Sequence, residues 1–152
     1  MEKIVILGGG ESGVGSAILA QDKGFDVFLS DSSTLKEQYK EELRKYNISF
    51  EEGKHSEDII LSAKEIIKSP GIPNYASIVV KAKAKGIPIL SEMEFAKRYT
   101  SAKMICITGS NGKTTTASLV YHILKSAGLN VGLGGNIGKS FARQVAHDHF
   151  EY

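Results

Sequence analysis

The chain has 152 residues, of which 41% are hydrophobic and 24% are charged, a composition that is ordinary for a water-soluble globular protein. The formal net charge of +2 is too small to argue for nucleic acid or an anionic membrane, so we expect neither as a partner. Cys106 is the single cysteine, which excludes an internal disulfide, and no apolar run is long enough to span a bilayer. The first residues lead straight into an apolar run without the layout of a signal peptide, so we expect a cytoplasmic protein.

The first hundred residues alternate between short apolar runs and helical patterns. Strands are expected at residues 3–7, 27–30, 48–50, 65–69 and 87–90. Helices are expected between and after them, at residues 14–23, 35–46, 78–86 and 91–99. Two of these helices begin with the spacing of a capping box, Thr34 to Glu37 and Ser91 to Glu94. Because parallel neighbouring strands need crossover connections, this order predicts an α/β fold with a Rossmann-like, doubly wound parallel sheet.

A second unit of strand, loop and helix follows the small polar stretch at residues 98–102. We expect a strand at 103–109, with Cys106 buried in it, and then a helix with one apolar face. That face consists of Thr116, Val120, Ile123, Leu124 and Ala127. The rest of the pattern is a strand at 130–133, a glycine-rich turn at 134–138 and a helix at 139–147. We therefore divide the chain into a Rossmann-like domain, residues 1–98, and the first part of a second α/β domain, residues 99–152.

The first candidate site is the glycine-rich turn after the first strand. Gly8, Gly10 and Gly13 have the GxGxxG spacing and stand between a strand and a helix. Glycines let the backbone approach a pyrophosphate, whose negative charge the N–H groups and the dipole of the helix start then favour. Asp31 follows Gly10 by 21 residues, the spacing at which an acidic residue meets a ribose or base in dinucleotide folds. The alternative is that these glycines form a tight turn that binds no ligand. If a ligand binds, it need not be NAD, because any nucleotide diphosphate presents the same pyrophosphate.

The second candidate site is the loop GSNGKT at residues 109–114. It is shorter than the regular P-loop, GxxxxGK[ST], because Ile107 stands where that motif has its first glycine. Its glycines still let backbone N–H groups form an anion-binding nest, and Lys113 can reach the β- and γ-phosphates of ATP. The hydroxyl of Thr114, or that of Thr115, can face Mg²⁺. Three β-branched hydroxyl residues in a row are poor helix formers, so the residues predict a P-loop-type ATP-binding domain rather than a packing role.

Together these motifs make the chain similar to the Mur ligases. TGSNGKTTT, residues 108–116, resembles the ATP loop of Mur ligases and folylpolyglutamate synthases. SPGIP at 69–73 and GGNIG at 134–138 narrow the resemblance. With the GxGxxG turn in front, they are similar to the branch of the family that adds D-glutamate to UDP-N-acetylmuramoyl-L-alanine in peptidoglycan synthesis. The resemblance covers the whole chain.

The resemblance implies a role for each motif. Contacts with the UDP-substrate are implied for Gly10, Glu11, Ser12, Gly13, Asp31, Ser32, Ser69, Pro70, Gly71 and Asn136. Glu11 and Ser12 would contact the diphosphate through their backbone N–H groups and the serine hydroxyl. Asp31 and Ser32 would contact the uracil or its ribose. Asn136 would contact the muramoyl part of the substrate. Contacts with ATP and Mg²⁺ are implied for Gly109, Ser110, Asn111, Gly112, Lys113, Thr114 and Thr115, with Lys113 as the catalytic residue and the two threonines at the metal.

The implied activity is ATP-dependent amide formation. ATP phosphorylates the terminal carboxylate of the UDP-substrate to an acyl phosphate, which the amine of D-glutamate attacks with release of phosphate. In the family, the central domain continues beyond the segment that ends here at Tyr152, and a third domain binds D-glutamate. The resemblance therefore implies an N-terminal fragment that is inactive as a ligase on its own.

Two other interpretations start from the first turn alone. A non-enzymatic nucleotide- or dinucleotide-binding regulatory module would explain residues 1–98, and a dehydrogenase fragment would predict a hydride-transfer site in the second half. Neither explains the motifs at 108–116 and 134–138. The choice of ligand, UDP against NAD, discriminates between these interpretations and the ligase.

Overall fold

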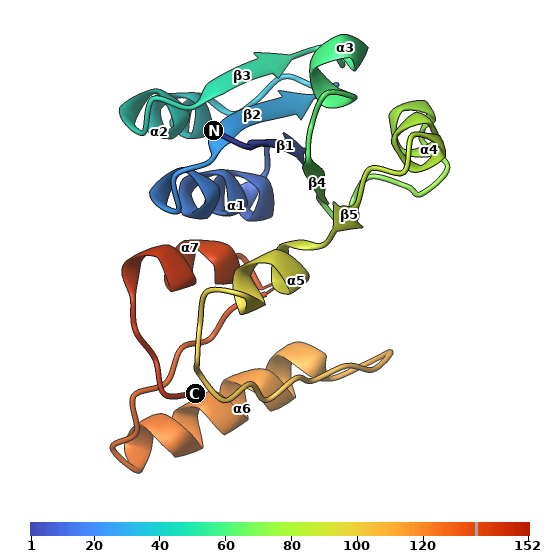
Figure 1. Cartoon of the computed structure of the whole chain (residues 1–152). Coiled ribbons are helices and arrows are strands. Elements are labelled where there is room, and N and C mark those ends of the chain that lie inside the picture. The colour runs from blue at the N-terminus through green and yellow to red at the C-terminus, as the bar shows by residue number, and fades with distance from the viewer. Residues whose placement is uncertain (136) are drawn as a thin grey trace.

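A computed structural model describes residues 1–135 and 137–152. Five strands form one parallel sheet in the order β3-β2-β1-β4-β5 (Figure 1). The strands are β1 (Lys3–Leu7), β2 (Asp26–Asp31), β3 (Ser49–Glu52), β4 (Glu65–Lys68) and β5 (Ile89–Leu90). Each overlaps the apolar run that predicts it, and the parallel pairing confirms the predicted α/β class.

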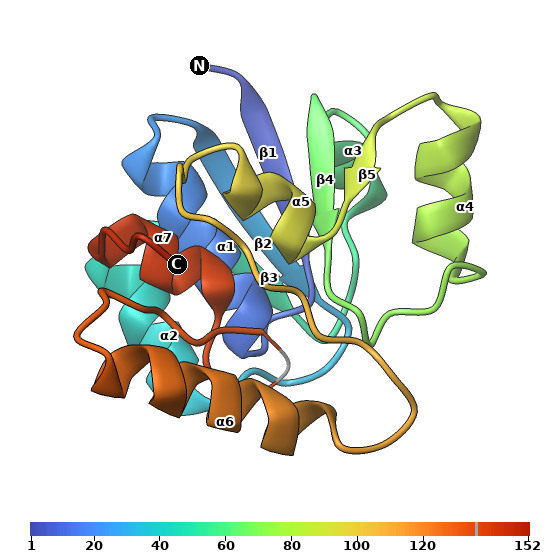
Figure 2. The same ribbon diagram turned by 90° about the horizontal axis from the view of Figure 1, so that it is seen from below.

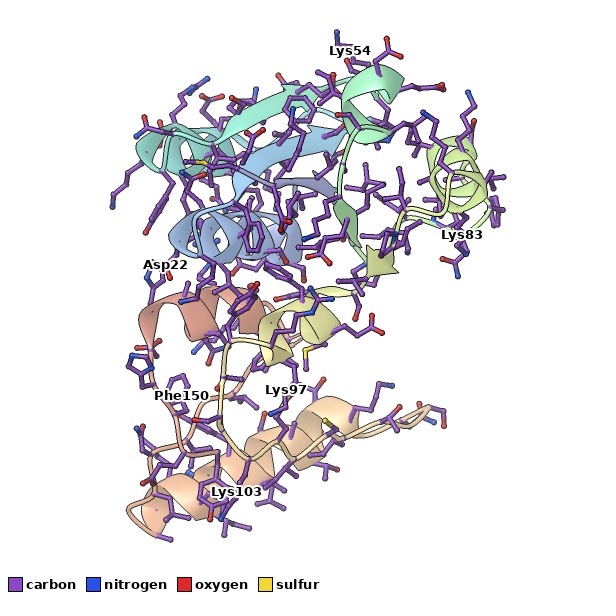
Figure 3. The ribbon with its side chains drawn as sticks, in the orientation of Figure 1. Asp22, Lys54, Lys83, Lys97, Lys103 and Phe150 are labelled. Carbon is purple, nitrogen blue, oxygen red and sulfur yellow. The ribbon has the colours of Figure 1, made fainter. Side chains whose placement is uncertain are left out.

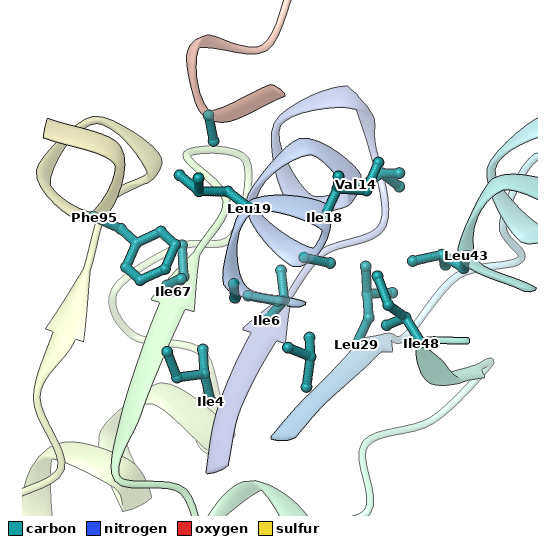
Figure 4. Packing of buried hydrophobic residues seen from close by; sticks show 14 of the residues in the cluster. Ile4, Ile6, Val14, Ile18, Leu19, Leu29, Leu43, Ile48, Ile67 and Phe95 are labelled. Atoms are coloured by element: carbon teal, nitrogen blue, oxygen red, sulfur yellow. The ribbon is translucent and has the colours of Figure 1, made fainter. Parts of the chain in front are cut away.

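Neighbouring side chains of β1 point to opposite faces of the sheet and enter two separate cores. Ile4 and Ile6 pack on one face (Figure 4). The helices on that face are α1 (Glu11–Asp22), α2 (Glu37–Lys45), α5 (Glu92–Lys97) and α7 (Phe141–His147). Val5 and Leu7 pack on the other face, against α3 (Glu57–Ile60) and α4 (Ser77–Ala84). Because helices cover both faces, β1 reads as a continuous apolar run rather than as an alternation.

The starts of α2 and α5 show where a local capping signal holds and where it fails. α2 begins at Glu37 without a side-chain cap, so the box predicted from Thr34 is not formed. Leu35 is only 5% exposed and packs in the core, and Lys36, the residue before α2, has an extended backbone. At α5 the box is confirmed: Ser91 Oγ accepts from Glu94 N–H at 3.2 Å, and Glu94 Oε2 accepts from Ser91 N–H at 2.7 Å. The free energy gained by burying the Leu35 side chain outweighs that of a side-chain cap, which contributes about 1 kcal/mol.

Residues 103–109 and 130–133 do not form the strands that their apolar pattern predicts. The N–H groups of Lys103 and Gly132 donate single hydrogen bonds of 2.9 Å, to the carbonyl oxygens of Glu151 and Tyr152. The N–H groups of Glu151 and Tyr152 in turn donate to Asn130 O at 3.0 and 3.3 Å. In the described part of the chain these few bonds do not extend into the ladder that a strand needs along its length. Cys106 is consequently exposed, not buried as the strand would require.

The long helix α6 (Lys113–Ser126) lies apart from the sheet, below α5 and α7 in Figure 1. None of its residues is buried, and Leu119 and Ile123 are 57% and 56% exposed. Phe150 lies between α7 and α6 in Figure 3. The helix forms where the sequence predicts it, but the described residues cover its predicted apolar face only in part: Val120 and Leu124 are half-buried, whereas Ile123 is exposed. No helix in the described ranges combines the length and the apolar character that a membrane crossing requires.

Candidate functional site

The glycine-rich turn joins β1 to α1 at the carboxyl edge of the sheet. Gly8 has a φ of +98°, a left-handed conformation that favours glycine, and its N–H donates to Ser30 O at 2.9 Å. A Cβ on Gly13 would lie 1.8 Å from Gly8 O, so α1 packs on the turn more closely than any other residue allows. Gly10 is exposed, with open space around it, and caps α1 without a side chain. The N-terminus of α1 is therefore accessible where a pyrophosphate is predicted to bind.

Asp31, at the end of β2, is bound to the backbone of this turn. Its Oδ2 accepts from Gly9 N–H at 2.6 Å, and its Oδ1 accepts from Ser33 N–H at 2.8 Å. The carboxylate therefore orders both the glycine turn and the loop after β2, in which Ser32 is exposed. This structural role was not expected from the spacing. The contact of Asp31 and Ser32 with a uracil or ribose remains a prediction.

The SPGIP turn follows β4 and lies against the glycine turn. Ser69 N–H donates to Leu7 O at 2.9 Å, and a Cβ on Gly8 would lie 2.7 Å from the Cβ of Ser69. The Lys68 ammonium donates to Ser69 O at 3.2 Å and to Ile72 O at 2.6 Å, which stabilises the turn. Three of the four segments predicted to contact the UDP-substrate thus meet at the carboxyl ends of β1, β2 and β4. Ligands of open α/β sheets bind at this edge.

A cavity of about 380 Å³ lies beside this edge and reaches the second half of the chain. Ser12, Lys68 and Pro70 line it from the first half, and Gly135 lines it from the GGNIG turn. The turn and the sheet edge, which are far apart in sequence, therefore share one cavity. Asn136, the residue predicted to face the muramoyl part of the substrate, lies outside the described residues.

The loop at residues 109–112 leads into α6 as its sequence predicts. Gly109 and Gly112 have φ values of +152° and +74°, and Gly112 is the residue that precedes the helix. Thr116 N–H is bonded to Gly112 O at 2.9 Å, so the three N–H groups before it lie at the open end of the helix. No acidic residue occupies the first turn of α6. The backbone therefore presents donors and no opposing negative charge from that turn to an anion.

Lys113 is the first residue of α6, and its side chain folds back over the loop. The ammonium donates to the carbonyl oxygens of Gly109 and Ser110, the latter at 3.1 Å. Lys113 is exposed, as are Thr114 and Thr115 beside it. The positive charge thus lies directly over the loop that is predicted to hold the phosphates.

A second cavity of about 380 Å³ lies between α6, the segment 102–107 and residues 131–135. Lys113 and Thr114 line it on the side of the ATP loop. Met93 and Gly135 line both cavities. Gly135 of the GGNIG turn therefore lines both the cavity at the sheet edge and the cavity beside the predicted ATP loop.

The contacts that join the two halves were missed by the sequence analysis. Arg143 of α7 is hydrogen-bonded to Glu11 and Glu42, which are 132 and 101 residues away in the chain. Burial lowers the pKa of the Arg143 guanidinium, but the hydrogen bonds to Glu42 and Glu11 outweigh this effect and hold the pKa above its ordinary value. Because no local pattern connects residues so far apart, the sequence alone carried no signal for this group.

A buried hydroxyl supports the end of β2. Ser30 is fully buried, and its Oγ lies 2.7 Å from both Glu51 Oε1, to which it donates, and His55 Nδ1. Glu51 also accepts from Ser56 N–H at 2.7 Å and from Ser56 Oγ at 2.5 Å. Burial raises the pKa of Glu51, but the hydrogen bonds from Ser56 and Ser30 outweigh it and hold the pKa below its ordinary value.

We expect acid to destabilise the protein partly through Glu51. Because its pKa is lowered by folding, its contribution to stability is present above the unfolded pKa of about 4.3 and is lost as the pH falls through the folded value. Glu51→Gln should therefore lose less unfolding free energy than the wild type between about pH 5 and pH 3, measured by urea denaturation at stepped pH. The exposed Glu41→Gln is the matched control and should follow the wild-type profile. Identical profiles for Glu51→Gln and wild type would contradict the assignment.

Two family models match the chain. The Mur ligase MurD-like N-terminal domain matches residues 2–91, and the Mur ligase middle domain matches residues 107–150. The boundary predicted near 98–102 falls between the two matched ranges.

Relatives and solved structures are consistent with these matches. The chain is 64% identical over 152 residues to UDP-N-acetylmuramoylalanine--D-glutamate ligase of Bacteroides thetaiotaomicron, covering 100% of this chain and 34% of the relative. The enzyme of the same name from Porphyromonas gingivalis is 63% identical over 149 residues, which are 98% of this chain and 33% of that one. The chain thus spans about a third of the length of these curated relatives.

Among solved structures, a pseudomurein peptide ligase type C from Methanothermus fervidus superposes with a TM-score of 0.59 at 29% identity, over 90% of this chain and 29% of that one. UDP-N-acetylmuramate-alanine ligase MurC from Thermotoga maritima gives a TM-score of 0.57 at 28% identity, over 86% of this chain and 30% of that one. The arrangement of sheet, helices and second half is therefore one that ligases of this kind share.

Proposed function

Because the chain belongs to the Mur ligase family, in its MurD-like branch, we propose that it carries the UDP-substrate site and the ATP loop of a UDP-N-acetylmuramoyl-L-alanine–D-glutamate ligase. In this proposal residues 1–98 are the UDP-substrate domain and residues 99–152 are the first part of the ATP-binding domain. The observation that carries it is the convergence of the turns at 8–13, 31–33 and 69–71 on one edge of the sheet, beside a cavity that reaches Gly135.

The diphosphate of the substrate would bind at the N-terminus of α1, to the backbone N–H groups of Glu11 and Ser12 and the Ser12 hydroxyl. The accessible helix start supports this placement, because N–H groups there have no partner within the helix and the helix dipole favours an anion. Ser12 also lines the cavity that leads toward Gly135. The muramoyl part of the substrate would therefore extend from the sheet edge toward the GGNIG turn.

The loop at 109–115 fits a nucleotide triphosphate with Mg²⁺. The open helix start, the left-handed Gly112 and the ammonium of Lys113 over the loop are suited to phosphate oxygens. Magnesium usually retains waters and phosphate oxygens as ligands, so a hydroxyl from Thr114 or Thr115 is a sufficient ligand from this segment. The ion, when bound, would neutralise charge on the phosphates. Lys113 would stabilise the negative charge that develops as the γ-phosphoryl group moves to the substrate carboxylate.

The proposed reaction forms one amide bond for each ATP. The substrate carboxylate attacks the γ-phosphorus and ADP leaves, and the amine of D-glutamate then attacks the acyl phosphate and displaces inorganic phosphate. The proton of the amine is released in the second step. The described residues show no site assigned to D-glutamate, so the partner amine remains part of the proposal for the longer ligase.

Ligand choice tests this proposal on the chain itself. We expect UDP to shift the amide NMR signals of residues 10–13 and 31–33, and NAD to shift them far less. Uridine is the matched control, because it offers the same base and ribose without the diphosphate. Larger shifts with NAD than with UDP would instead favour a dinucleotide-binding regulatory module.

A further inference from the structure

Arg143 connects the last helix of the chain to the first residue of the phosphate-binding helix. Its Nε donates to Glu11 Oε1 at 2.9 Å and its Nη2 donates to Glu11 Oε2 at 3.2 Å, a two-point contact between guanidinium and carboxylate. Its Nη1 donates to Glu42 of α2. Figures 1 and 2 both show α7 lying beside α1. Arg143 is thus shared by two carboxylates, of which one belongs to the helix start that is proposed to bind the diphosphate.

The position of α7 does not depend on Arg143 alone. Glu92 of α5 is 7% exposed, and its Oε1 accepts from Ser140 Oγ at 2.6 Å and from Ala142 N–H at 3.0 Å. A Cβ on Gly15 of α1 would lie 1.9 Å from Ser140 Oγ, so the two helices touch at this glycine. Ala142 is fully buried in the core. These contacts hold α7 on α1 and α5 even without the guanidinium.

The charge of Arg143 therefore has a role besides docking. Glu11 is the first residue of α1, and its own N–H group belongs to the proposed diphosphate site. A carboxylate in this turn would repel a diphosphate bound to the same N–H groups, because charges closer together than the screening length of about 8 Å at physiological salt still interact. Arg143 and the N–H of Ser140, at 3.2 Å, hold this carboxylate against α7. The contact neutralises Glu11 and turns it away from the accessible side of the helix start.

We propose that Arg143 is a positioning residue for diphosphate binding, which neutralises Glu11 and directs it toward α7. This rests on the proposed UDP-substrate site. Glu11 also lies near the GGNIG turn in the chain of contacts, because Ser140, whose N–H donates to Glu11, is two residues beyond that turn, and Gly135 N–H donates to Lys139 O at 3.0 Å.

The test compares UDP with uridine by calorimetric titration of the 152-residue chain. Arg143→Gln is expected to weaken UDP binding about tenfold, equivalent to roughly 1.4 kcal/mol, and to change uridine binding less than about twofold. The double variant Glu11→Gln/Arg143→Gln is expected to regain UDP affinity to within about threefold of wild type, because no uncompensated carboxylate is left at Glu11. Glu42→Gln, which leaves the Glu11 contact intact, is the matched control and should bind UDP as the wild type does.

The outcomes separate the two proposals. If the wild type binds no UDP, the proposed UDP-substrate site is wrong, and the role of Arg143 fails with it. If the wild type binds UDP and Arg143→Gln binds it equally well, only the role of Arg143 is overturned. The same holds if UDP and uridine lose affinity equally, or if the double variant is no better than Arg143→Gln. Arg143→Lys keeps the charge and should keep most of the UDP affinity, which provides a second comparison if Arg143→Gln does not fold.

Discussion

Replacement of Gly13 by alanine is expected to lower the free energy of unfolding by about 3 kcal/mol and to abolish UDP binding. The added Cβ would lie 1.8 Å from Gly8 O and 2.9 Å from Gly8 C, and both are backbone atoms that cannot rotate away. Helix propensity alone predicts the opposite sign, since alanine is favoured over glycine within a helix by about 1 kcal/mol. The steric cost is larger, so the substitution should move α1 off the turn. Urea denaturation and UDP titration measure the two effects.

Gly10→Ala is the matched control in the same turn. Nothing lies within 4 Å of a Cβ built on Gly10, and its φ of −80° suits any residue. The loss of stability should stay below about 1 kcal/mol, because alanine at an N-cap costs typically about 1 kcal/mol relative to the best capping residues and glycine already costs a few tenths of that. If Gly13→Ala and Gly10→Ala unfold at the same urea concentration, the close approach of α1 to the turn does not control stability.

In a ligase of the length of the curated relatives that carries this segment, Lys113→Ala is expected to lower turnover at least about 10²-fold, roughly 2.7 kcal/mol. In the proposed function, the ammonium would stabilise the charge that develops on the γ-phosphoryl group in the transition state of its transfer. UDP-substrate affinity should stay within about twofold, because that ligand is proposed to bind at the sheet edge. Steady-state turnover, UDP-substrate titration and the thermal midpoint of the same variant measure the three properties.

The fold should tolerate this substitution. The Lys113 side chain is exposed and its hydrogen bonds go to carbonyls of its own loop, while a cation in the first turn of a helix is opposed by the helix dipole. Lys125→Ala, in the last turn of the same helix, removes an equal charge away from the loop and should leave turnover unchanged. Turnover of Lys113→Ala within about tenfold of wild type would show that Lys113 does not act on the γ-phosphate.

Patterns of neighbouring residues in the sequence were enough to predict the sheet and the two glycine-rich turns, at residues 8–13 and 109–112. The apolar run of β1 predicts burial on both faces, and the crossover helices that parallel strands require were visible as separate patterns. The GxGxxG spacing located the Gly8–Gly13 turn, and the distance to Asp31 placed a carboxylate at the next strand end. The box at Ser91 and Glu94 formed as predicted because both partners lie within one turn of a helix.

Tertiary structure decided what depends on residues far apart in the chain. The box at Thr34 failed because Leu35 packs in a core whose other members come from other elements. The runs at 103–109 and 130–133 are strands by pattern only, since a strand forms when a neighbour completes its hydrogen bonds.

The contact of Arg143 with Glu11 had no sequence signal at all, because a charge pair 132 residues apart depends on where the fold brings its partners. The crossing of α7 over α1 at Gly15 decides it, and that crossing exists only once the sheet and its helices have assembled. Local patterns in the sequence were therefore enough to predict the sheet and the two glycine-rich turns. The tertiary structure alone determined how the two halves meet, because burial and charge pairing act through space rather than along the chain.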